Sequence, residues 1–313
     1  MSSSTRAFHV GVDENGLGAR LGPLVVTAVM AEVDERGVRA LSRPLPRRIA
    51  EDLDDSKRLV AHGNVGLGEA WARALSPTNA ATPQDVLSHV LLEPQTELER
   101  PCPRGLAGQC WSTRDEAFAA APELVARLSK HLRSLETRGV RVCAVRSSTT
   151  CTRLLNDAKA AGRTRFTVDL HAMERLILTL RDEAKTPLLA TCGKVGGIAD
   201  YSRYFGPLSG RLHAVLSEAR AHSAYHFPGL GELHFLQDAD AKHPLVMLAS
   251  LVGKWVRELL MARIVRFYAD AEGISHASGY NDPVTNTFVE KSALLRKRRR
   301  VPGTCFERVG ANG

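Results

Sequence analysis

The stretch GVDENGLGARLGPLVV, residues 11–26, constrains the fold of this chain more than any other part of its sequence. Apolar residues alternate with other side chains up to Val12, which is the period of a half-buried strand. Asp13 and Glu14 follow at once, and glycines then interrupt the chain before a second apolar run at residues 23–33. The pattern predicts two strands joined by a glycine turn, with two adjacent acids where the first strand ends.

The two acids admit two interpretations. Carboxylate oxygens that meet at one point suit Mg²⁺ or Mn²⁺, which prefer hard oxygen ligands. Neighbouring side chains of a strand point to opposite faces, so these acids converge only if the turn breaks the alternation. Gly16 and Gly18 would then let backbone N–H groups approach a phosphate or a sugar hydroxyl. A solvated turn is the alternative, because Asp, Glu, Asn and Gly are all common in turns. The glycine spacing, with the acids before it, does not fit a dinucleotide-binding fingerprint.

Strands and helices alternate along the rest of the chain. This order predicts an α/β fold with a mixed sheet flanked by helices. Asp169 precedes one helical pattern at the position of an N-cap. The further predicted strands lie at residues 140–145, 187–192 and 234–236, and the predicted helices at 67–75, 115–135, 170–180 and 244–268.

The chain is expected to form one domain over residues 1–313, with a helical extension at its C-terminal end. Residues 60–120 hold many glycines, prolines and polar residues, which predicts an insertion with some helix; a separate folded domain there is the alternative. Residues 285–313 are expected to form a basic C-terminal tail.

Positive charge is concentrated near the C-terminus. The chain has 42 basic and 34 acidic residues, which gives a formal net charge of +8. Six basic residues stand between Lys291 and Arg300 without an acid. Such a cluster suits a polyanion, since phosphate contacts release counterions. A solvated, positively charged helix end is the alternative.

The sequence also bears on where the protein works. No apolar stretch is long enough to cross a bilayer, and the opening residues MSSSTRAF lack the apolar run of a signal peptide. The six cysteines fit no zinc spacing, and although Cys102 and Cys110 could chelate or bridge, we expect reduced thiols. These features predict a cytoplasmic protein that does not contact a membrane, and we expect a monomer.

A second acidic site precedes the longest predicted helix. In QDADAKHPLVMLASLVGKWVRE, residues 237–258, Asp238 and Asp240 stand where a helix dipole stabilises acids. An ordinary helix cap therefore explains them as well as a metal site does. The helix then carries Lys254 and Arg257 on its more polar side.

Taken together, these residues resemble the type 2 ribonucleases H. That family opens with a strand ending in G-[IV]-D-E-A-G-R-G-P, which GVDENGLGARLGPLVV matches in order and spacing. Its D-S-K motif is matched by residues 55–57, and its helix motif P-x-x-x-A-A-S-I-x-A-K-V-x-R-D by residues 244–258. Its G-Y-P-S-D-P-x-T loop is matched by SGYNDPVT, residues 278–285, with one residue fewer. Four motifs in the right order are a more specific signal than any one of them.

The resemblance implies a ribonuclease-H-like sheet flanked by helices and endonucleolytic hydrolysis of RNA in RNA/DNA hybrids or in ribonucleotide-containing duplexes. Family members hold two divalent metals, Mg²⁺ or Mn²⁺, with four carboxylates; one metal activates water and the other steadies the leaving oxygen. Asp13 and Glu14 map onto the first two carboxylates and Asp240 onto the last. The implied nucleic-acid contacts map onto Gly16, Gly18, Lys57, Lys254 and Tyr280.

Two departures from the family pattern bear on activity. Leu17 stands where the family has an arginine between the glycines. The strand at 187–192 should lead to the third carboxylate, but residues 191–194 contain no acid. Asp200 is the nearest acid downstream and could reach back as a ligand, and Lys194 could supply a positive charge in place of a metal. The alternatives are therefore a catalytically impaired relative that binds nucleic-acid duplexes without turnover, and a different nuclease or phosphotransferase on the same fold.

Overall fold

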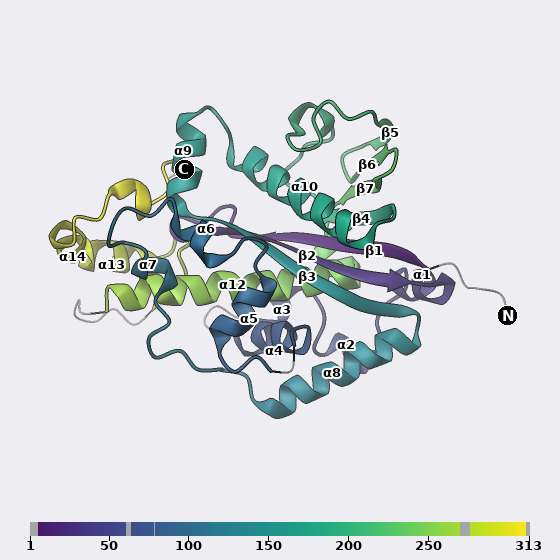
Figure 1. The fold of residues 1–313 in the computed structure, drawn as a ribbon, viewed down its shortest axis with the longest axis horizontal. Helices are drawn as coiled ribbons and strands as arrows, with labels where there is room; N and C mark the ends of the chain where they lie inside the picture. Colours follow the sequence, from purple (N-terminus) through teal and green to yellow (C-terminus); the bar gives the residue numbers. More distant parts are fainter. Residues whose placement is uncertain (1–5, 61–63, 78, 270–275, 311–313) are drawn as a thin grey trace.

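One mixed sheet of seven strands organises the part of the chain that the structure describes (Figure 1). The computed structural model describes residues 6–60, 64–77, 79–269 and 276–310, so residues 61–63, 78 and 311–313 of the predicted insertion and tail lie outside it. The strand order is β3-β2-β1-β4-β7-β6-β5. The strands are β1 (Ala7–Asn15), β2 (Leu24–Val33), β3 (Val140–Thr150), β4 (Leu188–Gly193), β5 (Ala214–Glu218), β6 (His222–Phe227) and β7 (Gly231–Leu236).

Antiparallel and parallel pairing both occur in this sheet. β1, β2 and β3 form an antiparallel meander. β4 lies parallel to β1 on its other side, and β7 lies parallel to β4. β6 and β5, which the sequence analysis did not predict, complete the edge as antiparallel strands. The predicted α/β fold with a mixed sheet flanked by helices is confirmed.

Helices cover both faces of the sheet. α10 (Arg165–Ala184) packs on one face and α12 (Pro244–Phe267) on the other (Figure 1). Alternation along β2 places Val25 in the core beside α12 and Val26 in the core beside α10. The central strands are therefore buried on both faces, which explains their nearly continuous apolar sequence.

The long helix predicted over 244–268 is confirmed by α12, and Pro244 lies in its first turn. α12 comes close to β1 because β1 carries a glycine where the two cross. A Cβ on Gly11 would lie 2.6 Å from the Cβ of Leu245 and would overlap the helix backbone as well. This close approach brings the polar side of α12 to the acid-bearing end of β1.

The shorter helices connect these elements and cover the edges of the sheet. None of the described helices is long and apolar enough to cross a membrane. The shorter helices are α1 (Glu35–Leu41), α2 (Arg47–Ala50), α3 (Ser56–Leu59), α4 (Gly66–Ala74), α5 (Pro83–Val90), α6 (Gln95–Glu99), α7 (Gly108–Trp111), α8 (Pro122–Thr137), α9 (Thr152–Ala160), α11 (Ala239–Lys242), α13 (Pro283–Lys291) and α14 (Ala293–Arg298), with 3-10 turns at η1 (Ser202–Tyr204) and η2 (Gly303–Cys305).

The described part of residues 60–120 contributes to the core beside α12. Trp71 on α4 is fully buried, and its indole N–H donates to the Asp52 carbonyl oxygen at 2.8 Å. Val86 and Leu87 on α5 belong to the same apolar cluster as Val25 of the sheet. This segment therefore shares its core with the sheet.

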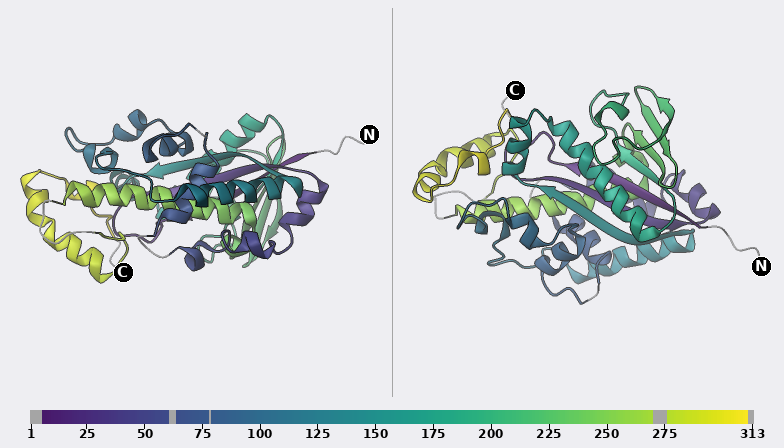
Figure 2. Two further views of the ribbon diagram at one scale, coloured as in Figure 1. Left: turned by 90° about the horizontal axis from the view of Figure 1, so that it is seen from below. Right: turned by 45° about the horizontal axis from the view of Figure 1, so that its top comes forward.

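The C-terminal region is helical, as predicted, and both views of Figure 2 place α13 and α14 beside the end of α12. Phe288 and Phe306 pack there against residues of α12. The Arg296 guanidinium lies 4.0 Å from the centre of the Phe306 ring, and Arg299 lies 4.6 Å from that of Phe267. Two of the six clustered basic residues are thus used in packing.

Two predicted helix starts are wrong. The helix expected from residue 170 begins at Arg165, because the Thr164 side chain caps it by accepting a hydrogen bond from the Thr167 N–H. Asp169 consequently lies inside the helix and is not its N-cap. The helix expected from residue 115 begins at Pro122, a residue type favoured in the first turn, and Asp115 has a left-handed φ of 58° that a helix does not accommodate.

Candidate metal centre

One cleft gathers most of the residues that the sequence analysis selected. It opens where the end of β1, the glycine turn that follows, α3, α11 and α12 meet. Asp200 is not among the described residues that line it. The predicted site residues that do line it are Asp13, Glu14, Gly16, Gly18, Lys57, Asp240, Lys254 and Tyr280.

Asp13 and Glu14 share the space beside the end of β4. β1 continues through Asn15, so the two acids lie at the end of the strand, as predicted. Their oxygens approach one point. A Cβ on Gly193, the last residue of β4, would lie 3.0 Å from Asp13 Oδ1 and 3.7 Å from Glu14 Oε2. Because residue 193 is a glycine, this point holds no side chain.

Asp240 comes from α11, a separate short helix before α12. The Lys57 ammonium on α3 donates to Asp240 Oδ2 at 2.8 Å, and this hydrogen bond raises the pKa of Lys57. Asp238 stands at the N-cap of α11 without a side-chain capping hydrogen bond. The interpretation of these two acids as ordinary caps of the long helix is therefore not supported.

Asp169 is a further acid at this site, and sequence reasoning missed it. Its side chain is fully buried on α10, and neither carboxylate oxygen has a hydrogen-bond partner among the described residues. It interacts electrostatically with Asp13 and Glu14. The signal in the sequence is an acid on the apolar face of a helix, four residues before Met173 of the core.

Burial and mutual repulsion control the ionisation of these acids. Burial, and then the neighbouring charge of Glu14, hold the pKa of Asp13 well above its usual range. Burial, and then the charge of Asp169, raise the pKa of Glu14 to about 8. Burial and the charge of Asp13 likewise raise the pKa of Asp169. A nearby cation would reverse this pattern, since it favours the charged form of each carboxyl group.

The end of β4 supplies no ligand in place of the missing acid. Cys192 is fully buried, and burial raises the pKa of its thiol. The Lys194 ammonium donates to the Ala219 carbonyl oxygen at 2.9 Å and to Ser223 Oγ at 2.6 Å. Lys194 is thus bound to the neighbouring strands, and the suggestion that it stands in for a metal is not supported.

Asp200 has its own partners away from the cleft. Its carboxylate accepts a hydrogen bond from Ser202 Oγ at 2.7 Å and pairs with Arg203. These interactions hold Asp200 in the loop before η1. The structure therefore does not bring Asp200 to the other three predicted acids.

The glycine turn after β1 is held by two arginines that sequence reasoning did not place there. A Cβ on Gly16, which has a φ of 89°, would lie 2.8 Å from Cδ of Arg257. Arg308, from the far end of the chain, is buried and donates to the Gly16 carbonyl oxygen at 2.5 Å and to that of Gly22 at 2.8 Å. Gly16 also has a left-handed backbone that other residues rarely adopt. The hydrogen bonds from Arg308 thus tie Gly16 and Gly22 of the turn to one buried side chain.

Tyr280 and Lys254 also line the cleft. Tyr280 is 41% exposed, and the Arg257 guanidinium lies 4.4 Å from the centre of its ring. An exposed ring supported by a cation can stack against a base or a sugar. The Lys254 ammonium donates to the Val60 carbonyl oxygen, and burial lowers its pKa.

The residues present fit a divalent metal. All the acids of the cleft offer hard oxygen ligands, Asp169 has two buried oxygens without partners, and the point beside Gly193 is free of side chains. Among the described residues, no three Asp, Glu, His or Cys side chains are already arranged around one metal position. The ion pair of Lys57 with Asp240 is one contact that a bound cation would replace.

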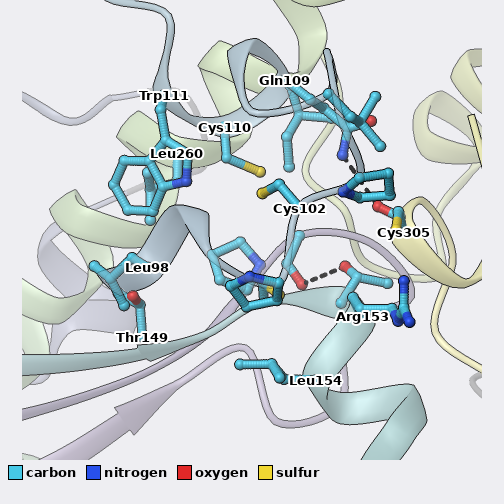
Figure 3. A pocket seen from close by; sticks show the side chains of 18 residues that line it. Leu98, Cys102, Gln109, Cys110, Trp111, Thr149, Arg153, Leu154, Leu260 and Cys305 are labelled. Carbon is cyan, nitrogen blue, oxygen red and sulfur yellow. Dashed lines mark hydrogen bonds between the residues drawn. The ribbon is translucent and has the colours of Figure 1, made fainter. Parts of the chain in front are cut away.

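A second cavity lies apart from the acids and is lined mainly by apolar side chains (Figure 3). Cys102, Cys110, Cys151 and Cys305 line it as free thiols. In Figure 3 the sulfurs of Cys102 and Cys110 point toward one another. Burial raises the pKa of Cys102 to about 11 and that of Cys110 to about 12, so both remain protonated near neutral pH.

Comparison with known proteins gives structural likenesses only. No family model and no curated protein sequence matches the chain. The chain is similar to ribonuclease HII of Archaeoglobus fulgidus, solved in a complex with PCNA, with 17% identity, a TM-score of 0.45 and coverage of 97% of this chain and 94% of that one. It is similar to Bst-RNase HIII in complex with Mn²⁺, with 13% identity, a TM-score of 0.49 and coverage of 98% and 68%. It is also similar to ribonuclease H2 of Pyrococcus horikoshii OT3, with 16% identity, a TM-score of 0.42 and coverage of 96% and 92%.

Proposed function

We propose that this chain is a metal-dependent endonuclease that hydrolyses RNA in RNA/DNA hybrids or in ribonucleotide-containing duplexes, with Mg²⁺ or Mn²⁺ as cofactor. One observation carries the proposal: the oxygens of Asp13 and Glu14 approach a single open point beside Gly193, in the cleft that also holds Asp240. Two adjacent carboxylates around one buried point lower the stability of the folded chain unless a cation binds there.

Each part of the cleft has a role in this proposal. Asp13, Glu14 and Asp240 would hold the metals, which when bound supply an activated water and steady the leaving oxygen. Lys57 lies next to Asp240 and would pair with a backbone phosphate once a cation takes its place. The backbone of Gly16 and its neighbours would position the sugar-phosphate backbone.

The sides of the cleft suit a duplex that is recognised by shape. Tyr280 offers an exposed ring face beside the acids, and Gly18 has no neighbouring atom within 4 Å of its Cβ position. Features of this kind would contact sugars and phosphates, and such contacts do not distinguish one base sequence from another. We therefore expect cleavage with little sequence preference.

The test is a cleavage assay on a labelled RNA strand in an RNA/DNA hybrid, and on a DNA duplex with a single ribonucleotide, with Mg²⁺ or Mn²⁺. We expect cleavage by the wild-type chain and a cleavage rate at least about 100-fold lower for Asp13→Asn. Mutation of residues that only support metal ligands already lowers metal affinity or activity by about 10- to 100-fold. Asp182→Asn, an exposed acid on α10, is the matched control and should keep full activity.

Absence of metal-dependent cleavage on both substrates would contradict the proposal. If the hybrid were bound in a salt-dependent way without turnover, the chain would be the catalytically impaired relative. Cleavage of another nucleic acid, still lost with Asp13→Asn, would instead identify a different nuclease.

A further inference from the structure

The end of β4 lacks an acid, yet the space for one is present. Gly193 is the last residue of β4, and its Cβ position lies 3.0 Å from Asp13 Oδ1 and 3.7 Å from Glu14 Oε2. The preceding residue, Cys192, is buried and offers a soft, protonated thiol instead of a hard oxygen. A metal bound beside Asp13 and Glu14 would thus receive carboxylate ligands from β1 but none from β4.

Asp169 is the buried acid that the rest of the fold leaves unexplained. It does not cap its helix, because Thr164 does, and among the described residues neither of its oxygens accepts a hydrogen bond. A buried carboxyl group without a partner costs free energy, so native structures seldom keep one without a function. α10 packs against both β1 and β4, and Asp169 interacts electrostatically with Asp13 and Cys192 on these two strands.

We propose that Asp169 is the fourth carboxylate of the metal site, supplied by helix α10 in place of the acid that β4 lacks. This inference rests on the proposed function, because it assigns a ligand at the same site. It would explain why the chain keeps a fully buried carboxylate whose two oxygens have no hydrogen-bond partner among the described residues.

The first experiment measures Mn²⁺ binding by isothermal titration calorimetry on the full chain, without substrate. Asp169→Asn should weaken Mn²⁺ binding by at least about tenfold, as expected for loss of a direct ligand. Asp13→Asn should weaken it in the same way, and Asp182→Asn should bind as the wild-type chain does.

Thermal unfolding separates a ligand from a structural acid. In EDTA, Asp169→Asn should unfold at the same temperature as the wild-type chain or above it, because the variant removes a buried acid without a partner. Added Mn²⁺ should raise the unfolding temperature of the wild-type chain much more than that of the variant. A structural role predicts the reverse in EDTA, namely a clear loss of stability.

A second variant moves the acid back to the strand. Gly193→Asp in the Asp169→Asn background places a carboxylate at a Cβ position that lies 3.0 Å from Asp13 Oδ1 and 3.7 Å from Glu14 Oε2. The double variant should regain Mn²⁺ binding and hybrid cleavage, and Gly193→Ala in the same background should regain neither. The alanine variant controls for crowding, since its Cβ lies 3.0 Å from Asp13 Oδ1.

The outcomes distinguish this inference from the proposed function. If Asp169→Asn binds Mn²⁺ as tightly as the wild-type chain while Asp13→Asn does not, Asp169 is not a ligand, whether or not the chain cleaves hybrids. If both variants lose Mn²⁺ binding and the wild-type chain cleaves no hybrid, the inference stands and the proposed function fails. A wild-type chain that binds no Mn²⁺ overturns the inference.

Discussion

Glu174 is a buried carboxyl group on α10 whose ionisation should make stability depend on pH. It accepts hydrogen bonds from the backbone N–H groups of Gly206 at 3.1 Å and Leu208 at 2.8 Å. Burial raises its pKa to about 7, although these two hydrogen bonds act in the opposite direction. The pKa is higher in the folded chain than the value of about 4.3 expected in the unfolded chain. The contribution to stability is therefore complete below about pH 4.3, falls as the pH rises and is lost above about pH 7, by up to about 3 kcal/mol.

Glu174→Gln keeps an acceptor oxygen and removes the titration. The free energy of unfolding of this variant, minus that of the wild-type chain, should increase between pH 5 and pH 7.5, because only the wild-type chain loses stability as Glu174 ionises; urea denaturation measures both. Glu183→Gln, a more exposed acid on the same helix that pairs with Arg146, is the matched control. Parallel pH curves for Glu174→Gln and the wild-type chain would show that Glu174 does not titrate in this range.

The crossing of α12 over β1 depends on Gly11. Its Cβ position overlaps the backbone of Leu245, which belongs to a rigid helix. Gly11→Ala should therefore lower the free energy of unfolding by about 1–3 kcal/mol, the usual cost of overpacking a core. Gly66→Ala, in the first turn of α4 with only the Asn64 side chain near its Cβ position, should leave stability unchanged or slightly raised. Chemical denaturation checks both; equal stabilities for the two variants would contradict the close crossing.

The elements themselves were largely predictable, because most of the strands and helices carry clear apolar periods. β5 was not, since Val215 and Leu216 are exposed and no alternation marks the strand. Asp169 was misread for a related reason. An acid before an apolar pattern looks like a cap, and only contacts with β1 show that it is buried. Local patterns record the period of an element, but not which distant element covers a given side chain.

Arg308, in the C-terminal region, binds the glycine turn that follows β1. Arg308 donates to the carbonyl oxygen of Gly16 across 292 positions of sequence, a contact that no local pattern could predict. Arg308→Ala should lower the free energy of unfolding by about 3 kcal/mol, because buried carbonyl oxygens lose their donors. Arg308→Lys should recover only part of this free energy, since the lysine ammonium lacks the planar set of donors of the arginine guanidinium. Arg298→Ala, an exposed residue of α14, is the control and should change stability by less than about 0.5 kcal/mol. Equal effects of Arg308→Ala and Arg298→Ala would contradict a clamp on the glycine turn.

The basic cluster between Lys291 and Arg300 should contribute to the binding of RNA/DNA hybrids. Of the C-terminal cluster, Arg296 and Arg299 have their guanidinium groups over phenylalanine rings. Lys291, Lys297 and Arg298 are exposed. If these three contact duplex phosphates, replacing them by glutamine should reduce the salt dependence of hybrid affinity by about 2–3 in the slope of log K against log salt, since each phosphate contact contributes about 0.9. Fluorescence anisotropy with a labelled RNA/DNA hybrid in EDTA, between 50 and 200 mM salt, measures this slope.

The matched control neutralises three exposed cations elsewhere: Lys130 and Arg133 on α8, and Arg138 at its C-cap. Figure 1 places α8 away from α13 and α14. Both triple variants lose the same formal charge, so a general attraction between the basic chain and a polyanion would lower the two slopes equally. A contact surface on α13 and α14 lowers only the first, because counterions are released where phosphates are actually neutralised. Equal slopes in the two variants would therefore show that the C-terminal cluster attracts duplexes without contacting them.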